Sequence, residues 1–541
     1  MFKLNQKHNQ HSMYESTEWM DPRIRNKLEK SWAPIFYEYV FSNIEEEPFA
    51  VLYGNTGKPN FPVNIILSLE YIKHIKECND LELLDSYYFD YLVNYAVGNR
   101  TLGEKNLAER TLYYFRERVY SYCLENPGGE KLLFEQFLGL LKKFSKKASV
   151  SLDEQRTDTT LFMSNIKKAG RISLAYDVLV RAVKAIPETI RTDALSKVLE
   201  PDFKTDILYR SKAADADSKL TMLLALCNVA VAVLEAVPGM SDAEELRIAK
   251  RFLKEQAIID SEGKIVAKPK KEISSNSLQS AFDEDATYRT KGYVGQSGYA
   301  LEISETCGKE NPFQLITDYA VKPNTISDVE ILKDRLPIIK ENTDCTDMYV
   351  DGGFHSDKVH QAAEENDIEI HLTNMVGKKS YKYFSPGDYE IDEDTNVITK
   401  CPGGHAPQRA GVSKGQSVAH FSHEACSNCP LREKCQSKEQ KKNYVVRINI
   451  NAIKASRERE AMNVARVENT GKRAGIEGTN SALKRKGQKK LDVRGIIKSD
   501  MVSGLKVSAQ NIKRFIKYMQ GGYDLKSIPP PDHRILAPIP G

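Results

Sequence analysis

Apolar residues recur at helical spacing through the first 148 residues of the chain. This periodicity predicts helices over residues 61–78, 80–98 and 106–125, which Gly, Asn or Pro residues separate. A fourth helix is predicted over residues 129–148, and it ends in lysines, which the helix dipole favours at that end. Basic and aromatic residues on these helices suit a DNA-binding head, although a helical packing domain fits the same periodicity equally well.

Beyond Ser149 the pattern changes to alternation of apolar and polar residues. The stretch RTDTTLF, residues 156–162, predicts a strand that carries Asp158 near its end. A long helical block follows from residue 173 to about residue 257. The lysine-rich and serine-rich segment over residues 261–277 then has the composition of a loop.

Strands return at Gly298. The stretches GYALEIS and PFQLITDYAV, residues 298–304 and 312–321, are close enough to pair as an antiparallel hairpin. A helix fits residues 325–342, with Thr325 or Ser327 as its N-cap.

A short apolar run, Met348 to Val350, ends on Asp351 and is followed by two glycines. We expect a strand, a sharp turn and a helix that reaches Asn366, and then another strand over residues 367–375. A strand that ends on a carboxylate can present it at the rim of a sheet. The same stretch also fits a plain surface turn.

The order of these elements is strand, hairpin, helix, strand, helix, strand, which predicts a mixed α/β layer with crossover helices between parallel strands. It is the order of ribonuclease-H-like folds if the helical block after Asp158 is an insertion. We therefore expect a helical N-terminal DNA-binding domain (1–148), the first part of a ribonuclease-H-like core (149–166), a helical insertion (167–275), the central part of the core (276–375), a cysteine-rich insertion (376–450), the C-terminal part of the core (451–525) and a tail (526–541).

Composition sets wide limits. A chain of 541 residues is too long for one core, and 41% hydrophobic with 28% charged residues excludes disordered and fibrous classes. The 78 basic residues nearly balance the 74 acidic ones, so a nucleic-acid surface has to be a local cluster.

No signal peptide is evident. The longest apolar run, residues 221–237, contains Asn228 and Glu235, so we expect a buried helix rather than a membrane span.

Four of the nine cysteines lie close together late in the chain, which favours a reducing compartment and a metal site. They are Cys401, Cys426, Cys429 and Cys435, and His405 lies close to the first of them. Four thiolates, or three with a histidine, suit tetrahedral Zn²⁺ in a structural site. Free thiols in an inserted subdomain are the alternative.

Residues 471–500 form the strongest local cluster of positive charge, with nine Lys or Arg residues and three acidic ones. Such a segment can neutralise DNA phosphates or can simply be a solvated helix face. Within it, helical spacing places Glu477 on one face with Arg473 and Lys484. A single carboxylate on a basic face is either a salt-bridge partner or a metal ligand.

The stretches RTDTTLFMSNI, YVDGGFHS and KRAGIEGTNSALKR together resemble the DDE transposases of bacterial insertion sequences, in the group with a Tyr-x2-Arg-x3-Glu-x6-Lys signature. Arg473, Glu477 and Lys484 match the signature, whereas Thr470 stands at the tyrosine position. The resemblance implies that Asp158, Asp351 and Glu477 hold two Mg²⁺ or Mn²⁺ ions. It also implies that basic residues beside Glu477, namely Arg473, Lys484 and Arg485, contact DNA.

The first acid has two rivals in the segment FDEDATY. Asp283 and Asp285 precede the second strand and could replace Asp158, but they lie in a loop pattern, whereas Asp158 lies in a strand within an Asp-x-Thr motif. We therefore favour Asp158. The two other acids then cap a turn or pair with Arg289.

For function, the resemblance implies an enzyme that binds terminal inverted repeats and then cuts and joins DNA. Its implied partners are the element ends and target DNA, a second copy of the chain in the synaptic complex, and no membrane. Its implied location is the bacterial cytoplasm, in association with the nucleoid. There are two rival interpretations. One is a transposase-derived DNA-binding protein that no longer cleaves, and the other is a metal-dependent nuclease that does not join strands.

Overall fold

The computed structural model describes residues 1–6, 15, 17–103, 105–128, 131–210, 215–291, 294–373 and 383–521, without the side chains of residues 291, 461–468 and 470. The chain forms two compact units. The large unit comprises Met1–Cys345 and Ile476–Gly541, and the small unit comprises Thr346–Gly475.

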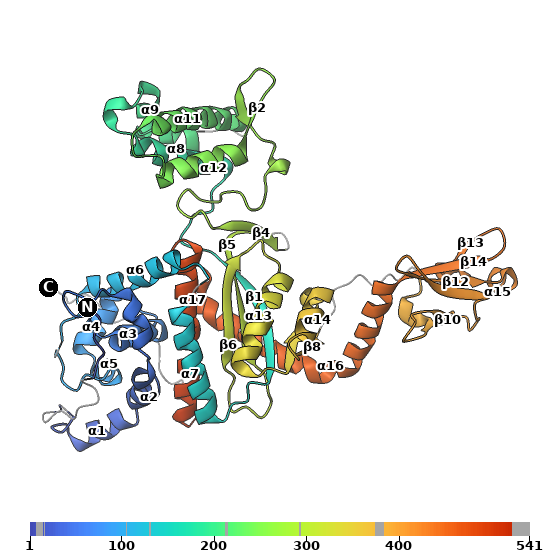
Figure 1. Ribbon diagram of the computed structural model, residues 1–541, viewed down its shortest axis with the longest axis horizontal. Helices are drawn as coiled ribbons and strands as arrows, with labels where there is room; N and C mark the ends of the chain where they lie inside the picture. The colour runs from blue at the N-terminus through green and yellow to red at the C-terminus, as the bar shows by residue number, and fades with distance from the viewer. Residues whose placement is uncertain are drawn as a thin grey trace, which may run out of the picture. The chain divides into compact units, whose positions relative to one another are not determined.

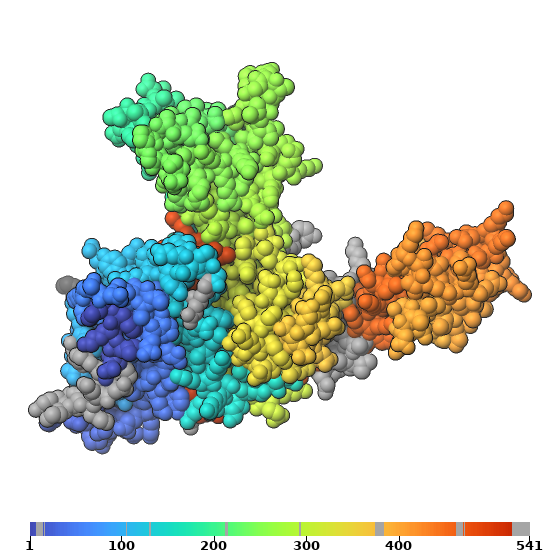
Figure 2. Space-filling model, viewed as in Figure 1, coloured from blue at the N-terminus to red at the C-terminus, as the bar shows by residue number. Residues whose placement is uncertain are grey.

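The N-terminal part of the large unit is helical, as the periodicity predicts. Its α-helices are α1 (Pro22–Glu29), α2 (Trp32–Tyr39), α3 (Val63–Lys76), α4 (Asp80–Phe89), α5 (Tyr91–Ala96), α6 (Glu109–Glu125) and α7 (Leu132–Ala148). The helix predicted over residues 80–98 is two helices, because Asp90 has an extended backbone and its carboxylate caps α5. These residues pack into one continuous body, blue to cyan in Figure 2.

The sheet of the large unit is antiparallel. Its strands are β1 (Glu154–Phe162), β4 (Thr287–Lys291), β5 (Val294–Thr306) and β6 (Ile316–Pro323). β5 pairs with each of the other three, so the predicted hairpin of β5 and β6 is confirmed, whereas β4 was not expected. The expectation that Asp158 lies near the end of its strand is wrong, because Asp158 is the fifth of nine residues in β1 and pairs with Ile303.

A glycine lies where the pairing of β5 changes from β4 to β1. Gly298 has a φ of +141°, and a Cβ there would collide with the carbonyl oxygen of Phe162. Because side chains other than glycine rarely adopt such a φ, this position holds β5 close to β1.

Helix α13 (Asp328–Thr343) packs against β5 and β6, with the hydroxyl of Ser327 accepting the N-terminal hydrogen bond. The predicted helix and one of its two proposed caps are thereby confirmed. Arg335 of α13 forms a buried ion pair with Asp318 of β6, 2.5 Å long.

Helix α17 (Ile496–Met519) joins the N-terminal helices to the sheet. It contacts α2, α3, α6 and α7 as well as β6, and Figure 1 shows it beside α7. Asn511 satisfies the backbone hydrogen-bonding groups of Ile316 in β6. Its Nδ2 donates to the oxygen of Ile316 at 2.7 Å, and its Oδ1 accepts from the nitrogen of Ile316 at 2.8 Å. One hydrophobic core therefore includes head, sheet and α17.

The helical block predicted after β1 is present and has a core of its own. It comprises α8 (Arg171–Ala185), α9 (Asp193–Lys197), α10 (Pro201–Leu208), α11 (Ala216–Ala236), α12 (Glu244–Gln256) and the hairpin of β2 (Ala257–Ile259) and β3 (Ile265–Ala267). β3 lies in the segment predicted as a loop. Figure 1 draws the block in green.

In the described part of the chain, α11 is the one helix whose length and apolar composition would suffice to cross a membrane. One face of α11 packs against α8 and α12 through Leu220, Leu223, Cys227 and Leu234. Only 39% of the most apolar window of α11 is buried, so the buried helix expected from the sequence is found in part.

The small unit begins with the predicted strand, turn, helix and strand. These are β7 (Asp347–Val350), the 3₁₀ turn η7 (Gly352–Phe354), α14 (Asp357–Glu364) and β8 (Glu369–Leu372), and β7 and β8 pair in parallel. The cysteine-rich segment follows with β9 (Glu390–Ile391), β10 (Ile398–Lys400), β11 (Arg409–Ser413), β12 (Gln416–Phe421), α15 (His423–Ser427), β13 (Lys438–Glu439) and β14 (Tyr444–Asn449). A separate apolar core supports it, around Phe421, Tyr444 and Ile448.

Helix α16 (Ile450–Leu483) follows β14 and belongs to the small unit up to Gly475 and to the large unit from Ile476. It passes directly into a π-helical segment, η10 (Lys484–Gln488), in which Gly487 has a φ of +82°. The sequence predicted a helix around Glu477 but gave no indication of the length of α16. The chain as a whole is a mixed α/β protein with antiparallel and parallel strand pairs.

Candidate active site

Asp158 is a half-exposed carboxylate between buried neighbours on β1. Its Oδ2 accepts a hydrogen bond of 2.9 Å from Nδ2 of Asn480, which lies on α16. Asn480 is itself buried. The end of α16 in the large unit is therefore held against the strand that carries the first predicted acid.

A buried ionic cluster holds the same end of α16 in place. Glu305 of β5 is fully buried and pairs with Arg156 of β1 at 2.7 Å and with Arg514 of α17 at 3.0 Å. Thr479 of α16 donates to the second carboxylate oxygen of Glu305 at 2.7 Å. A buried carboxylate is stable only when it is paired in this way, so the cluster fixes β1, β5, α16 and α17 to one another.

Glu477 lies on α16 three residues before Asn480, and its side chain is exposed. Residues three apart on a helix lie on the same side. Glu477 therefore lies on the side of α16 that faces β1, as Asn480 does. Lys484 and Arg485 are also exposed, and they are the first two residues of η10. The side chain of Thr470, at the tyrosine position of the signature, lies outside the described residues.

Asp351 lies in the small unit, directly after β7, and caps the turn η7. Its Oδ1 accepts from the nitrogen of Gly353 at 2.7 Å, and Nη2 of Arg473 donates to its Oδ2 at 3.3 Å. The side chain is 35% exposed, so it still faces solvent. The sequence placed Arg473 on one helix face with Glu477 and Lys484, and the contact of Arg473 with Asp351 was not predicted.

The strand before Asp351 is held by contacts that the sequence did not predict. Lys472 of α16 donates to the hydroxyl of Tyr349 at 2.8 Å and lies over its ring. Tyr349 stacks on His371 of β8, and His371 contacts Asp347 at 2.7 Å. Burial is the largest influence on the pKa of Asp347 and raises it, yet Thr346 and His371 lower the pKa more in sum, so the pKa of Asp347 is below its usual value.

The two rival acids have structural partners. Asp283 is buried and accepts from Ser164 at 2.5 Å and from the hydroxyl of Tyr299 at 2.6 Å. Asp285 caps α17 by accepting from the nitrogen of Ile496 at 3.0 Å. The expectation of a turn cap holds for Asp283, which also accepts from the nitrogen of Ala286 at 3.3 Å, whereas Asp285 caps a helix and Arg289 pairs with Asp328.

The thiols of the four late cysteines line one small cavity of about 20 Å³ in the small unit, together with His405. Burial raises the pKa of the Cys426 thiol first, and the other three cysteines raise it further. Four cysteines, or three with a histidine, are residue types that tetrahedral Zn²⁺ takes in structural sites, where it binds the thiolate form. The structural zinc at these cysteines stays a prediction from the sequence.

The basic segment after Glu477 lines a cavity of about 570 Å³ in the large unit, between η10, α17 and the helices α3 and α6. Seven cations line it, namely Lys73, Arg116, Arg485, Lys486, Lys490, Lys498 and Lys506, together with four acids, Glu70, Glu77, Glu117 and Asp492. Burial, followed by the charge of Lys513, lowers the pKa of Lys486 to about 8. Several of these cations are already paired, because Arg116 contacts Glu70 and Asp80 and Lys498 contacts Glu117, so the cavity carries only a modest excess of positive charge.

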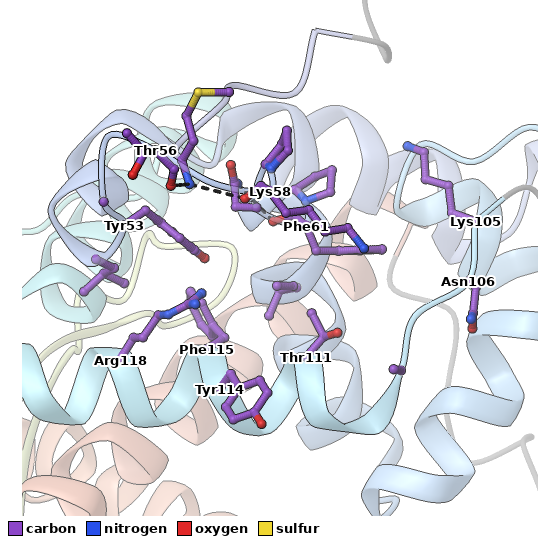
Figure 3. Close-up of a pocket in the computed structure, with 18 residues that line it drawn as sticks. Tyr53, Thr56, Lys58, Phe61, Lys105, Asn106, Thr111, Tyr114, Phe115 and Arg118 are labelled. Atoms are coloured by element: carbon purple, nitrogen blue, oxygen red, sulfur yellow. Dashed lines mark hydrogen bonds between the residues drawn. The ribbon is translucent and has the colours of Figure 1, made fainter.

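A second large cavity, about 830 Å³, lies on the N-terminal helices and is drawn in Figure 3. Arg118, Phe115 and Tyr114 reach it from α6, and Tyr53 and Lys58 face them from the opposite wall. Arg118 lies over the ring of Tyr53, with its guanidinium carbon 4.8 Å from the ring centroid. Cationic and aromatic groups around one hollow form the kind of surface that binds phosphates and bases.

The sequence did not single out Asn480, Thr479, Arg156 or Glu305. Asn480 and Thr479 lie within the quoted stretch around Glu477, and their helical spacing from it could have marked them as neighbours. Arg156 and Glu305 gave no such signal, because they are 149 residues apart in the chain.

Residues 400–516 match the family model of the transposase DDE domain. The match includes the cysteine segment, α16 with Glu477, and α17. The resemblance to DDE transposases is thereby confirmed, while the subgroup signature and the assignment of Asp158 and Asp351 stay predictions. No curated protein and no solved structure matches the chain.

Proposed function

Since residues 400–516 match the transposase DDE domain, we propose that the chain binds the ends of a mobile DNA element, cleaves the DNA there and joins the freed ends to target DNA. The observation that carries this proposal is the hydrogen bond from Asn480 to Asp158, because it keeps the helix of Glu477 at the strand of the first acid. The core of this enzyme would be ribonuclease-H-like.

In this proposal, Asp158, Asp351 and Glu477 would hold two Mg²⁺ or Mn²⁺ ions. Carboxylate oxygens are the ligands that these hard cations prefer, and all three side chains are at least partly exposed. When bound, the ions supply activation of the attacking oxygen and neutralisation of the leaving oxygen. The protein contributes positioning: Asn480 orients Asp158, and Gly353 and Arg473 orient Asp351.

Basic residues beside the acids would hold the DNA backbone. Arg473 contacts Asp351 at 3.3 Å, so a phosphate bound near Asp351 would find this guanidinium within reach. Lys484 and Arg485 are exposed after Glu477 and would contact phosphates next to it. Removal of one such cation is expected to weaken DNA binding for all sequences alike.

The N-terminal helices would recognise the element ends. The cavity of Figure 3 supports this role, because Lys58, Lys105 and Arg118 surround it together with Tyr53 and Tyr114. A double variant, Lys105→Ala with Arg118→Ala, is expected to lose end binding while the acids stay intact. Binding of end DNA at constant salt measures this effect.

The test is a cleavage assay with purified protein, Mg²⁺ and DNA that carries candidate element ends. Asp158→Asn, Asp351→Asn and Glu477→Gln are each expected to abolish cleavage and to leave end binding largely unchanged. Asp357→Asn and Glu364→Gln, two exposed acids of α14, serve as matched controls and should cleave normally.

Cleavage by Asp158→Asn at the wild-type rate would refute the assignment of the first acid. If wild type binds ends but never nicks them with Mg²⁺ or Mn²⁺, the chain is a transposase-derived DNA-binding protein, an alternative that Thr470 at the tyrosine position favours. Nicking without joined products would indicate a nuclease.

The proposed reaction brings two ends together, so we propose that two copies of the chain assemble on them. Light scattering should give the mass of two chains with end DNA, and a single chain on every DNA would contradict this. The same function implies a cytoplasmic protein that acts on nucleoid DNA, and fluorescence of the tagged chain in cells tests that location.

A further inference from the structure

Two histidines and a glutamate meet in the small unit, in a cluster that the proposed reaction does not use. His355 follows the turn η7, His360 lies on α14 and Glu458 lies on α16. Each residue offers one ligand atom, and these atoms all lie within 4.8 Å of one another. Three separate segments therefore contribute to one cluster.

The contacts in this cluster are incomplete. Nε2 of His355 contacts a carboxylate oxygen of Glu458, and the rings of His355 and His360 lie 5.8 Å apart at an interplanar angle of 72°. Nε2 of His360 is buried and has no hydrogen-bond partner among the residues that the structure describes. A buried polar atom without a partner costs about 1–3 kcal/mol, and a ligand at that nitrogen would remove this cost.

We propose that His355, His360 and Glu458 form a binding site for a divalent transition metal, with Zn²⁺ as the ion that fits best. Two imidazoles and a carboxylate are a known zinc ligand set, with a fourth position for water. Mg²⁺ would instead select oxygen ligands only.

The spacing of the cluster agrees with such an ion. Two ligand atoms on one tetrahedral zinc lie roughly 3.3 Å apart, which follows from bonds of about 2.0–2.1 Å. A spread of up to 4.8 Å is within reach of small side-chain rotations. The side chains of His355 and Glu458 are 27% and 34% exposed, so an ion can enter from solvent.

The ion would tie α16 to the turn that carries Asp351. His355 terminates the turn η7, which Asp351 caps. Glu458 would be the ligand of the same ion that lies on α16. The metal would act here as a clamp on the turn, separate from the ions proposed for the three acids. It is also separate from the cysteine cavity, which neither histidine lines.

The test is metal binding by the full chain after removal of bound metal, with Zn²⁺ as the probe in calorimetric titrations. Wild type should bind one equivalent of Zn²⁺ more than His360→Ala, or should bind that equivalent about 100-fold more tightly. Loss of a residue that only supports a ligand already lowers metal affinity about 10- to 100-fold, and loss of the ligand itself should lower it at least as much. His420→Ala, which removes an imidazole of β12, is the control and should match wild type.

Co²⁺ distinguishes this site from the cysteines. The part of the Co²⁺ absorbance that His360→Ala removes should lack the thiolate charge-transfer band, and Cys429→Ser should leave that part intact. A His360-dependent band of thiolate character would overturn the assignment of ligands.

Equal zinc stoichiometry and affinity in wild type, His360→Ala and Glu458→Gln, with circular dichroism that shows folded variants, would overturn the proposal. So would a Glu458→Gln variant whose melting temperature falls equally with and without Zn²⁺, since His355 and Glu458 would then form an ion pair only. These readouts need no DNA and no cleavage, so the proposed function can fail while this site stands.

Discussion

Asn480 donates a hydrogen bond from Nδ2 to Oδ2 of Asp158, across 2.9 Å and 322 positions of sequence. The bond leaves the carboxylate half-exposed while it fixes its orientation. Asn480 is therefore a positioning residue for the first predicted acid.

Asn480→Ala is expected to slow cleavage about 10- to 100-fold, since a hydrogen bond to a charged group contributes about 1.5–3 kcal/mol. The Mg²⁺ concentration needed for half-maximal rate should rise, because Asp158 becomes less ordered. Single-turnover cleavage at a series of Mg²⁺ concentrations measures both effects. Ser481→Ala, an exposed neighbour, is the control, and equal Mg²⁺ dependence in the two variants would contradict the positioning role.

Glu305→Gln should destabilise the large unit strongly. The substitution leaves the buried Arg156 guanidinium and its neighbour Arg514 without a counter-charge, which costs about 3–5 kcal/mol when a buried pair loses one member. Denaturant unfolding measures the loss. Glu310→Gln removes an exposed acid nearby in the chain and should change the unfolding free energy little, and similar values for both variants would contradict the importance of the cluster.

Gly353→Ala should displace the carboxylate of Asp351. A Cβ at this position would lie 2.9 Å from Oδ1 of Asp351, which is closer than real Cβ contacts allow. The contact is with the end of a side chain, so folding should change little while cleavage falls. Cleavage rate and melting temperature are measured together, with Gly471→Ala as the control because nothing lies within 4 Å of a Cβ there. Wild-type cleavage by Gly353→Ala would contradict the fit.

Glu302 should make stability depend on pH. It is buried on β5, and burial, followed by the charge of Asp318, raises its pKa to about 8 from an ordinary value of 4.5. Between these values the folded chain keeps a proton that the unfolded chain loses, so the free energy of unfolding falls as pH rises from about 4.5 to 8. The whole decline amounts to a few kcal/mol.

Glu302→Gln has no such proton and should become progressively more stable than wild type across that pH window. Denaturant unfolding from pH 5 to 8 measures the difference. Parallel curves for wild type and Glu302→Gln would show that Glu302 is ionised in the folded chain.

Removal of zinc should loosen the cysteine segment. Its small core rests on few apolar residues, so Zn²⁺ at the four thiols would contribute much of its stability. A chelator, or Cys429→Ser, should speed amide exchange in β11, β12 and β14. Cys123→Ser on α6 should leave exchange there unchanged, and exchange that is insensitive to both chelator and Cys429→Ser would rule out a structural zinc.

Much of the local structure could be predicted because its signals are local. The period-2 alternation predicted β1 and the hairpin of β5 and β6, and the cap at Ser327 marked the start of α13. The apolar run before Asp351 and the two glycines after it likewise predicted β7 and its turn. In each case the deciding residues are neighbours in sequence.

The remaining features depend on distant partners. Asp283 is not free to bind a metal because it accepts a hydrogen bond from Ser164, which lies 119 positions away in the chain. No local pattern in the sequence reveals that contact. The pairing of Glu305 with Arg514 spans 209 positions. The strand β4 is defined by its pairing with β5 rather than by its own composition, which mixes Thr, Tyr, Arg and Lys.

The place of α17 in the fold also bears on how the protein is made. Phe515 of α17 stacks on Phe144 of α7 at 4.3 Å, and Asn511 closes the edge of β6. The ribosome synthesises α7 and β6 long before it reaches these residues. The apolar surface that α17 covers therefore stays exposed in the nascent chain until α17 is made. Chains released before residue 496 lack the helix that covers α7 and β6, so a prematurely terminated copy of this gene would leave no completed N-terminal domain to compete for DNA.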